Sequence, residues 1–158
     1  MTLDARLVVR LQFLCRVIWQ ECHYLQDTDN RLFQTPLDHE ALQKINADPV
    51  LAERLDAFVA RFARLQDSLG DKLLPALLTA TGEAHGPALD NLDKAEKFYW
   101  ITSADQWMAM RRLRNQMVHE HIEDPAVLIS ALTSAHEFVG ELTATANRFA
   151  AIAARFIT

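Results

Sequence analysis

Glycine and proline are scarce in this sequence, with four and five residues among 158. Because these residues form many of the turns in proteins, their scarcity favours a few long helices over many short strands. No apolar run reaches the roughly 18 residues that span a bilayer, and the N-terminus lacks the basic and apolar regions of a signal peptide. We therefore expect one globular domain, residues 1–158, in the cytoplasm and without membrane contact.

Cysteine and tryptophan are also rare, and neither indicates a functional site. Only Cys15 and Cys22 occur, and seven residues on one helix separate them by about 10 Å, which is too far for a disulfide. We expect both to be small, buried apolar side chains. Trp19, Trp100 and Trp107 fall within helical apolar patterns and are expected to be core or interface side chains.

Basic residues are outnumbered, 16 against 21 acidic ones, which gives a net charge of −5. A nucleic-acid-binding protein is usually basic, so this balance does not indicate one. Arginine nevertheless outnumbers lysine twelve to four, and Arg111, Arg112 and Arg114 lie within four residues. Any phosphate-binding site must therefore be local.

Apolar residues recur in steps of three and four along most of the chain, which is the spacing of a buried helix face. Asp48-Pro49 and Asp124-Pro125 each place an N-cap before a proline in the first turn. Ser103 and Gln106 have the form of a capping box, and Asp27–Asn30 is expected to end the first helix. The predicted helices cover residues 3–25, 48 to about 70–75, 87–100, 103 to about 121, and 124 to about 156. The long helix from residue 48 is expected to kink or end near Gly70 to Pro75. Residues 31–47 are ambiguous, and a short helix at 36–42 is one interpretation of them. The predicted fold is all-α, an up-and-down bundle of about five to six helices.

One predicted helix carries an unusual polar stripe. Arg111, Asn115 and His119 follow the spacing i, i+4, i+8 and so share one side of the helix. Burying such a stripe would leave several donors unsatisfied. The stripe is therefore either simply solvated or part of a functional site, and its spacing alone does not decide between the two.

The surroundings of this stripe carry a family resemblance. The stretch Trp107-x3-Arg111-x-x-Arg114-Asn115-x3-His119, with its Ser103 cap and the following Asp124-Pro125, resembles the HEPN superfamily. It is most similar to HepT-like toxins, which are encoded beside minimal nucleotidyltransferases. The segment 61–67 also resembles the part of such proteins that packs against the motif helix. The resemblance covers most of the chain after about residue 50.

The resemblance implies a homodimeric toxin that cleaves RNA without a metal or other cofactor, paired with a nucleotidyltransferase antitoxin. RNA supplies its own nucleophile, so cleavage needs an acid, a base and stabilisation of the charged phosphate. The implied catalytic residues are His119 as acid and base, Arg114 as a phosphate clamp and Asn115 as a polar orienter. Arg111 and His121 are additional candidates for contacts with phosphate or RNA.

Two features bear on how such a site would work. Five residues at about 100° each place Arg114 and His119 about 140° apart on a helix, so a two-fold dimer is needed to complete a shared cleft. The family commonly has a tyrosine two residues after the motif histidine, which the nucleotidyltransferase modifies with AMP to silence the toxin. This chain has His121 there, so that silencing reaction cannot be transferred, whereas His121 could be a second proton-transfer group.

Two alternatives remain open at this point. The chain could be a non-catalytic HEPN module that dimerises and docks a nucleotidyltransferase with its substrate. It could also be a helical interaction bundle with a solvated arginine stripe. A metal site is not indicated, because residues 119–123 lack the second histidine of a His-Glu-x-x-His motif.

Overall fold

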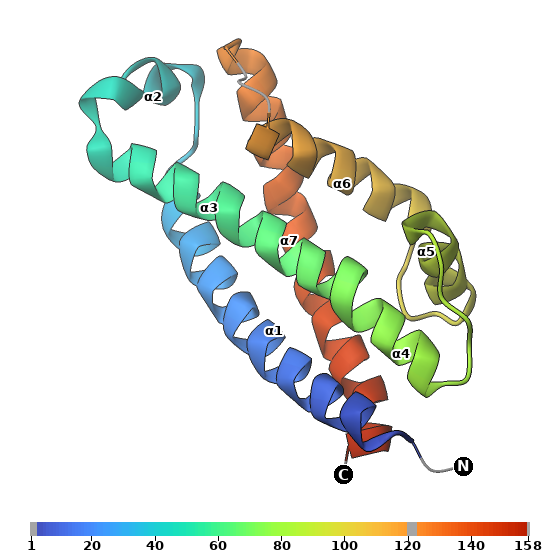
Figure 1. The fold of residues 1–158 in the computed structure, drawn as a ribbon. Coiled ribbons are helices and arrows are strands. Elements are labelled where there is room, and N and C mark those ends of the chain that lie inside the picture. The colour runs from blue at the N-terminus through green and yellow to red at the C-terminus, as the bar shows by residue number, and fades with distance from the viewer. Residues whose placement is uncertain (1–2, 120–122, 158) are drawn as a thin grey trace.

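The computed structural model describes residues 3–119 and 123–157, apart from the side chain of His119, and those residues form helices and no strand (Figure 1). The predicted all-α bundle is confirmed, whereas the homodimer stays a prediction. None of the helices in the described ranges is long and apolar enough to cross a membrane. The elements are α1 (Ala5–Leu32), α2 (His39–Gln43), a 3-10 turn η1 (Ile45–Ala47), α3 (Pro49–Asp67), a π-helical segment η2 (Ser68–Leu73), α4 (Leu74–Ala80), α5 (Ala88–Lys97), α6 (Ala104–His119) and α7 (Pro125–Ile157).

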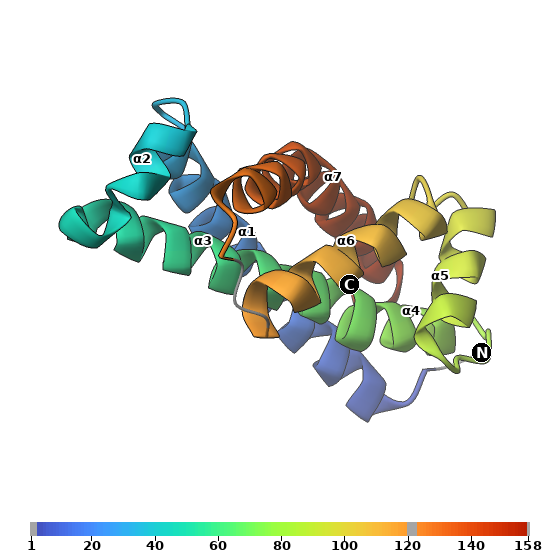
Figure 2. The same ribbon diagram turned by 90° about the horizontal axis from the view of Figure 1, so that it is seen from above.

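Three long rods build the bundle. α3, η2 and α4 form one continuous rod that packs against α1, and α7 packs against both (Figures 1 and 2). α6 lies on α3 and also contacts α5 and α7. The core between the rods is made of large apolar side chains with almost no exposure, among them Leu11, Leu14, Phe58, Phe62, Leu65, Leu77, Phe138 and Phe149. Burial of these side chains is the main force that holds the helices together.

The first helix is longer than its sequence predicts. Asp27–Asn30 does not end it, because α1 continues to Leu32. Thr28 and Asp29 are buried there, and both are held by other helices. Arg61 donates to the Thr28 hydroxyl and to the Tyr24 carbonyl, and His136 lies 2.6 Å from the Asp29 carboxylate. Tertiary contacts thus override a local turn signal.

Of the kink or end predicted near Gly70 to Pro75, the structure shows a change of winding and no end. The chain passes from α3 through the π-helical turn η2 directly into α4. Gly70 lies against the ring of Trp107, and a Cβ at this glycine would come within 3.1 Å of the indole nitrogen. The absence of a side chain at residue 70 therefore allows α6 to approach the rod closely.

The predicted helix starts are largely confirmed. Asp48 accepts a hydrogen bond from the Leu51 backbone at 3.0 Å, and Ser103 accepts one from the Gln106 backbone at 3.1 Å. α5 ends at Lys97 instead of residue 100, since Tyr99 has a φ of 61°, which no helix allows. The predicted end of the motif helix near His121 lies outside the described residues.

Candidate functional site on α6

The backbone of α6 is helical from Ala104 to His119, so the sequence spacing translates directly into positions around one helix. Its apolar side, which includes Trp107 and Leu113, packs into the bundle. Arg111, Asn115 and His119 follow one another along a stripe that drifts by about 40° at each step. Arg114 lies about 140° from His119 around the axis and about 7.5 Å from it along the axis.

The structure brings Arg114 and Asn115 together and fixes both to the neighbouring rod. One terminal nitrogen of Arg114 forms an ion pair with the Asp67 carboxylate at the end of α3. The other donates to the amide oxygen of Asn115 at 2.5 Å. The Arg114 side chain is only 16% exposed. Because this arginine is mostly buried and doubly held, it is not part of a freely solvated stripe.

Arg111 forms a second, looser pair on the same contact between helices. Its guanidinium lies 3.5 Å from Asp71 in η2, and the two side chains are 33% and 42% exposed. Asp67 and Asp71 are four residues apart, while Arg111 and Arg114 are three apart. The two pairs therefore join α6 to the α3–η2 rod one turn apart. The 61–67 segment that the sequence singled out thus supplies the partner of Arg114.

Polar groups without partners accompany the Arg114 pair. The Nε atom of Arg114 is buried and has no hydrogen-bond partner among the described residues, and the same holds for both amide atoms of Gln66. Gln66 directly precedes Asp67 and is 2% exposed. Buried donors and acceptors are nearly always satisfied in proteins, so such a concentration is unusual. These groups lie on α6 and at the end of α3, the two helices that the Arg114–Asp67 pair joins.

Asn115 is the exposed member of the motif. Its amide oxygen is occupied by Arg114, whereas its amide nitrogen has no partner among the residues that the structure describes. The amide N–H groups are therefore oriented by the hydrogen bond on the other side of the same group. They are free to donate to an acceptor such as a phosphate oxygen.

A further carboxylate lies behind Asp67, at the contact of α1 with the rod. Ser68 donates to Glu21 at 3.0 Å, and the second carboxylate oxygen of Glu21 is buried without a partner among the described residues. Burial raises the pKa of Glu21, against the opposing effects of the Ser68 hydrogen bond and the charges of Arg64 and Lys72. The proton affinity of this group is thus set mainly by desolvation.

His119 has a described backbone in the last turn of α6, and its side chain and all of His121 lie outside the described residues. Within the described ranges no three histidine, cysteine, aspartate or glutamate side chains gather in a way that could hold a metal ion. A shallow groove of about 370 Å³ borders the motif, between Leu113 and Gln116 of α6 and Ser130 and Ser134 of α7.

A larger groove lies elsewhere, between α1 and α7, and the sequence did not predict it. Its volume is about 910 Å³, and Trp19, Cys15 and Cys22 line it. Trp19 is 63% exposed, so of the two expectations, core or interface, only an interface position stays open for it, while Trp107 is buried in the core. The cysteines are half-buried rather than fully buried. Burial raises the pKa of Cys15, and it raises that of Cys22 to about 11.

The comparisons with known proteins identify no relative: no family model, curated protein or solved structure matches the chain.

Proposed function

We propose that the chain is a metal-independent endoribonuclease of the HEPN kind that acts as a homodimer in the cytoplasm. Its biological role would be that of a toxin held in check by a nucleotidyltransferase antitoxin. The observation that carries the proposal is the chain of contacts from Asp67 through Arg114 to Asn115. These contacts hold Arg114 and Asn115, two of the three residues that match the family signature, and leave the Asn115 amide nitrogen as an exposed donor.

The proposed reaction is an internal transfer at phosphorus. The 2′-oxygen of a ribose loses its proton to a base and attacks the adjacent phosphorus, and the bond to the 5′-oxygen breaks. The leaving oxygen receives a proton from an acid, which gives a 2′,3′-cyclic phosphate and a 5′-hydroxyl end. Histidine suits both proton transfers near neutral pH, so His119 is the proposed acid and base.

The contacts refine the roles of the other motif residues. Arg114 already donates to Asp67 and Asn115, so part of its capacity to bind phosphate is in use. We assign it the orientation of Asn115, because the Asp67 carboxylate compensates its positive charge. Asn115 would donate through its free amide hydrogens to a phosphate oxygen as negative charge accumulates there. Arg111, one turn away, would bind a neighbouring phosphate.

The same geometry supports the proposed homodimer. A single α6 offers one motif histidine, and this histidine is turned about 140° away from Arg114. A second copy related by a two-fold axis would add its own histidine and asparagine to the cleft. Val118 on α6 and Val127 on α7 are large apolar side chains exposed beside the motif. Their exposure supports a contact surface at this edge.

RNA cleavage by the purified protein in the presence of EDTA tests the proposal. We expect a mixed-sequence RNA to be cut into products with cyclic phosphate ends. Cutting should fall by at least about 100-fold in His119→Ala, the range typical for loss of a proton-transfer group. His39→Ala is the matched control, because His39 lies in α2, away from α6. Equal cutting by wild type and by the folded His119→Ala variant would refute the proposal.

A second candidate is the non-catalytic module that docks a nucleotidyltransferase and presents its substrate. The engagement of Arg114 by Asp67 favours it, since a phosphate clamp would have to share that guanidinium. The net charge of −5 favours it as well. This module would leave RNA intact and form a stable complex with a nucleotidyltransferase, which copurification would detect.

A further inference from the structure

The groove between α1 and α7 has a charge pattern that differs from the rest of the chain. Residues 5–20 of α1 contain three arginines, residues 142–157 of α7 contain two, and neither stretch has an aspartate or glutamate. The remaining residues hold 11 basic against 21 acidic side chains, a net charge of −10. Arg6 and Arg148 are paired with Asp4 and Glu141 just outside these stretches. Arg10, Arg16 and Arg155 are exposed and have no carboxylate partner among the described residues, so an acidic protein keeps three unpaired arginines on the two helices that form the groove. Such a surface attracts polyanions.

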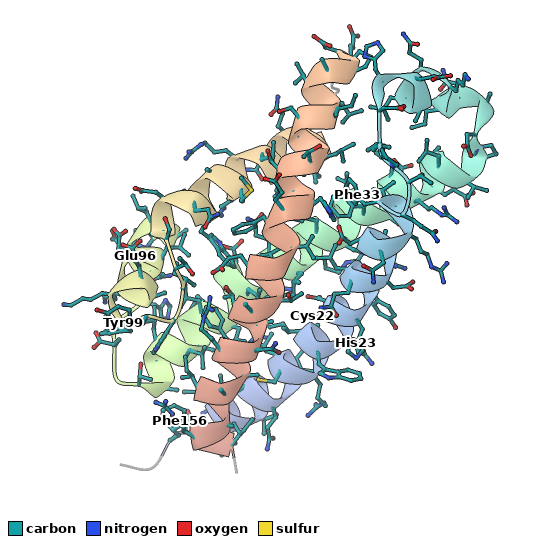
Figure 3. The ribbon with its side chains drawn as sticks, turned by 180° about the vertical axis from the view of Figure 1, so that it is seen from behind. Cys22, His23, Phe33, Glu96, Tyr99 and Phe156 are labelled. Atoms are coloured by element: carbon teal, nitrogen blue, oxygen red, sulfur yellow. The ribbon has the colours of Figure 1, made fainter. Side chains whose placement is uncertain are left out.

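The lining of the groove is rich in uncharged hydrogen-bonding groups and in aromatic surface. Figure 3 shows Cys22 and His23 on α1 beside α7. Trp19 and His23 pack their rings together with centroids 4.1 Å apart, and Trp19 remains 63% exposed. Amides and a hydroxyl complete the lining, from Gln12, Gln20, Gln26, Thr143 and Asn147.

Arg16 supplies the charge within the groove itself. It lines the groove, is exposed, and forms no salt bridge or hydrogen bond with any residue in the described part of the chain. By contrast, Arg111 and Arg114 on α6 are both paired with carboxylates. The guanidinium of Arg16 is therefore available to a ligand without displacing a partner.

We propose that this groove binds single-stranded RNA, with Trp19 and His23 as the surface on which bases stack and Arg16 as a phosphate contact. Proteins that hold single strands combine a basic groove with exposed aromatic side chains, and amides donate to and accept from base edges. A second copy of the chain fits less well, because a two-fold contact here would bring basic against basic surface. The choice of RNA rests on the proposed function, whereas binding of a single-stranded polyanion does not.

Binding can be measured apart from cleavage. A labelled strand of about 12 nucleotides, a length typical of such sites, with 2′-O-methyl groups lacks the nucleophile and cannot be cut. We expect fluorescence anisotropy to report binding by the full chain, weakened at least about fivefold by Trp19→Ala. Arg16→Ala should weaken strand binding and reduce the slope of log affinity against log salt concentration by about one, the value for one lost phosphate contact. The matched controls are Tyr99→Ala, an exposed aromatic on another surface, and Arg54→Ala, an exposed arginine on α3.

The outcomes separate the two proposals. If Trp19→Ala weakens binding and the wild type leaves RNA intact, the proposal of a binding groove is supported and the nuclease proposal is refuted. If wild type cuts RNA while Trp19→Ala and Arg16→Ala bind the strand as the controls do, the groove is refuted and the nuclease survives. Binding to phosphatidylserine vesicles in place of the strand would overturn the groove assignment too. A matching DNA strand shows whether the ribose contributes. Far-UV circular dichroism establishes that each variant is folded, as expected for exposed side chains.

Discussion

The two Arg–Asp pairs between α6 and the α3–η2 rod allow a controlled measurement, because they share one interface and differ in burial. A double-mutant cycle removes each charge alone and both together, through Asp67→Ala with Arg114→Met and Asp71→Ala with Arg111→Met. The cycle isolates the interaction of each pair from the other effects of its substitutions. The looser pair serves as the internal control for the tighter one.

The expected magnitudes follow from exposure. Hydrogen bonds to charged groups contribute about 1.5–3 kcal/mol when they are shielded from water. Arg114 is 16% exposed but Asp67 is 36% exposed, so we reduce the expected coupling of this pair to about 1–2 kcal/mol. Arg111 and Asp71 are 3.5 Å apart and more exposed, which places them with surface pairs at about 0.2–1 kcal/mol. Raising the salt concentration should weaken the second coupling more than the first.

Urea unfolding followed by far-UV circular dichroism measures both cycles, at one fixed protein concentration because a dimer would make stability depend on it. A coupling between Asp67 and Arg114 below about 0.5 kcal/mol would contradict the role of Asp67 as the residue that fixes Arg114. A coupling between Asp71 and Arg111 that exceeds the coupling between Asp67 and Arg114 would contradict this role as well. Either result would remove the contact on which the proposed orientation of Asn115 depends.

Two further predictions concern the surroundings of the site. Glu21→Gln should raise the free energy of unfolding at pH 7 but not near pH 4. Burial raises the pKa of Glu21 above its usual 4.5, so the protonated form that the folded state favours is lost as the pH rises. Urea unfolding at both pH values measures this, and an equal difference between variant and wild type at the two pH values would refute the reasoning. Gly70→Ala should destabilise the fold by about 1 kcal/mol because the new Cβ would meet the buried Trp107 ring. Gly140 lies mid-helix in α7, where a Cβ would have nothing within 4 Å, so Gly140→Ala should stabilise the fold by about 0.5–1 kcal/mol. Thermal unfolding measures both, and a shift of the two variants in the same direction would refute the contrast.

The helices could be predicted because their signals are local. The caps at Asp48 and Ser103 depend on residues within one turn. The same reasoning fails at Asp27–Asn30, where Arg61 and His136 hold the chain in a helix from more than 30 residues away. It also leaves Trp19 undecided between core and interface, since periodicity identifies helical residues but not whether a neighbouring helix covers them. The i, i+4 pair of Trp19 with His23 and the lack of acids from residue 5 to 20 were the available signals.

The candidate site was predictable in its residues but not in its contacts. The motif spacing selected Arg114 and Asn115, and helix geometry alone leaves them about 100° apart around the axis. Their hydrogen bond needs the Arg114 side chain to lie along the helix surface, which Asp67 on another helix supports. An ion pair between residues 47 positions apart depends on the packing of α6 against α3. No local pattern contains that information.

These contacts also decide which motif residues can meet a ligand first. Arg114 is turned toward α3 and mostly buried, whereas Asn115 is exposed and lies only about 40° from His119 around the helix. Asn115 therefore lies on the accessible side of α6, one turn before the backbone of His119, and Arg114 holds the Asn115 amide oxygen. In the proposed nuclease the scissile phosphate would approach this side. Because the Asp67 carboxylate compensates the charge of Arg114, the contribution of Arg114 there would be to hold the Asn115 amide in one orientation.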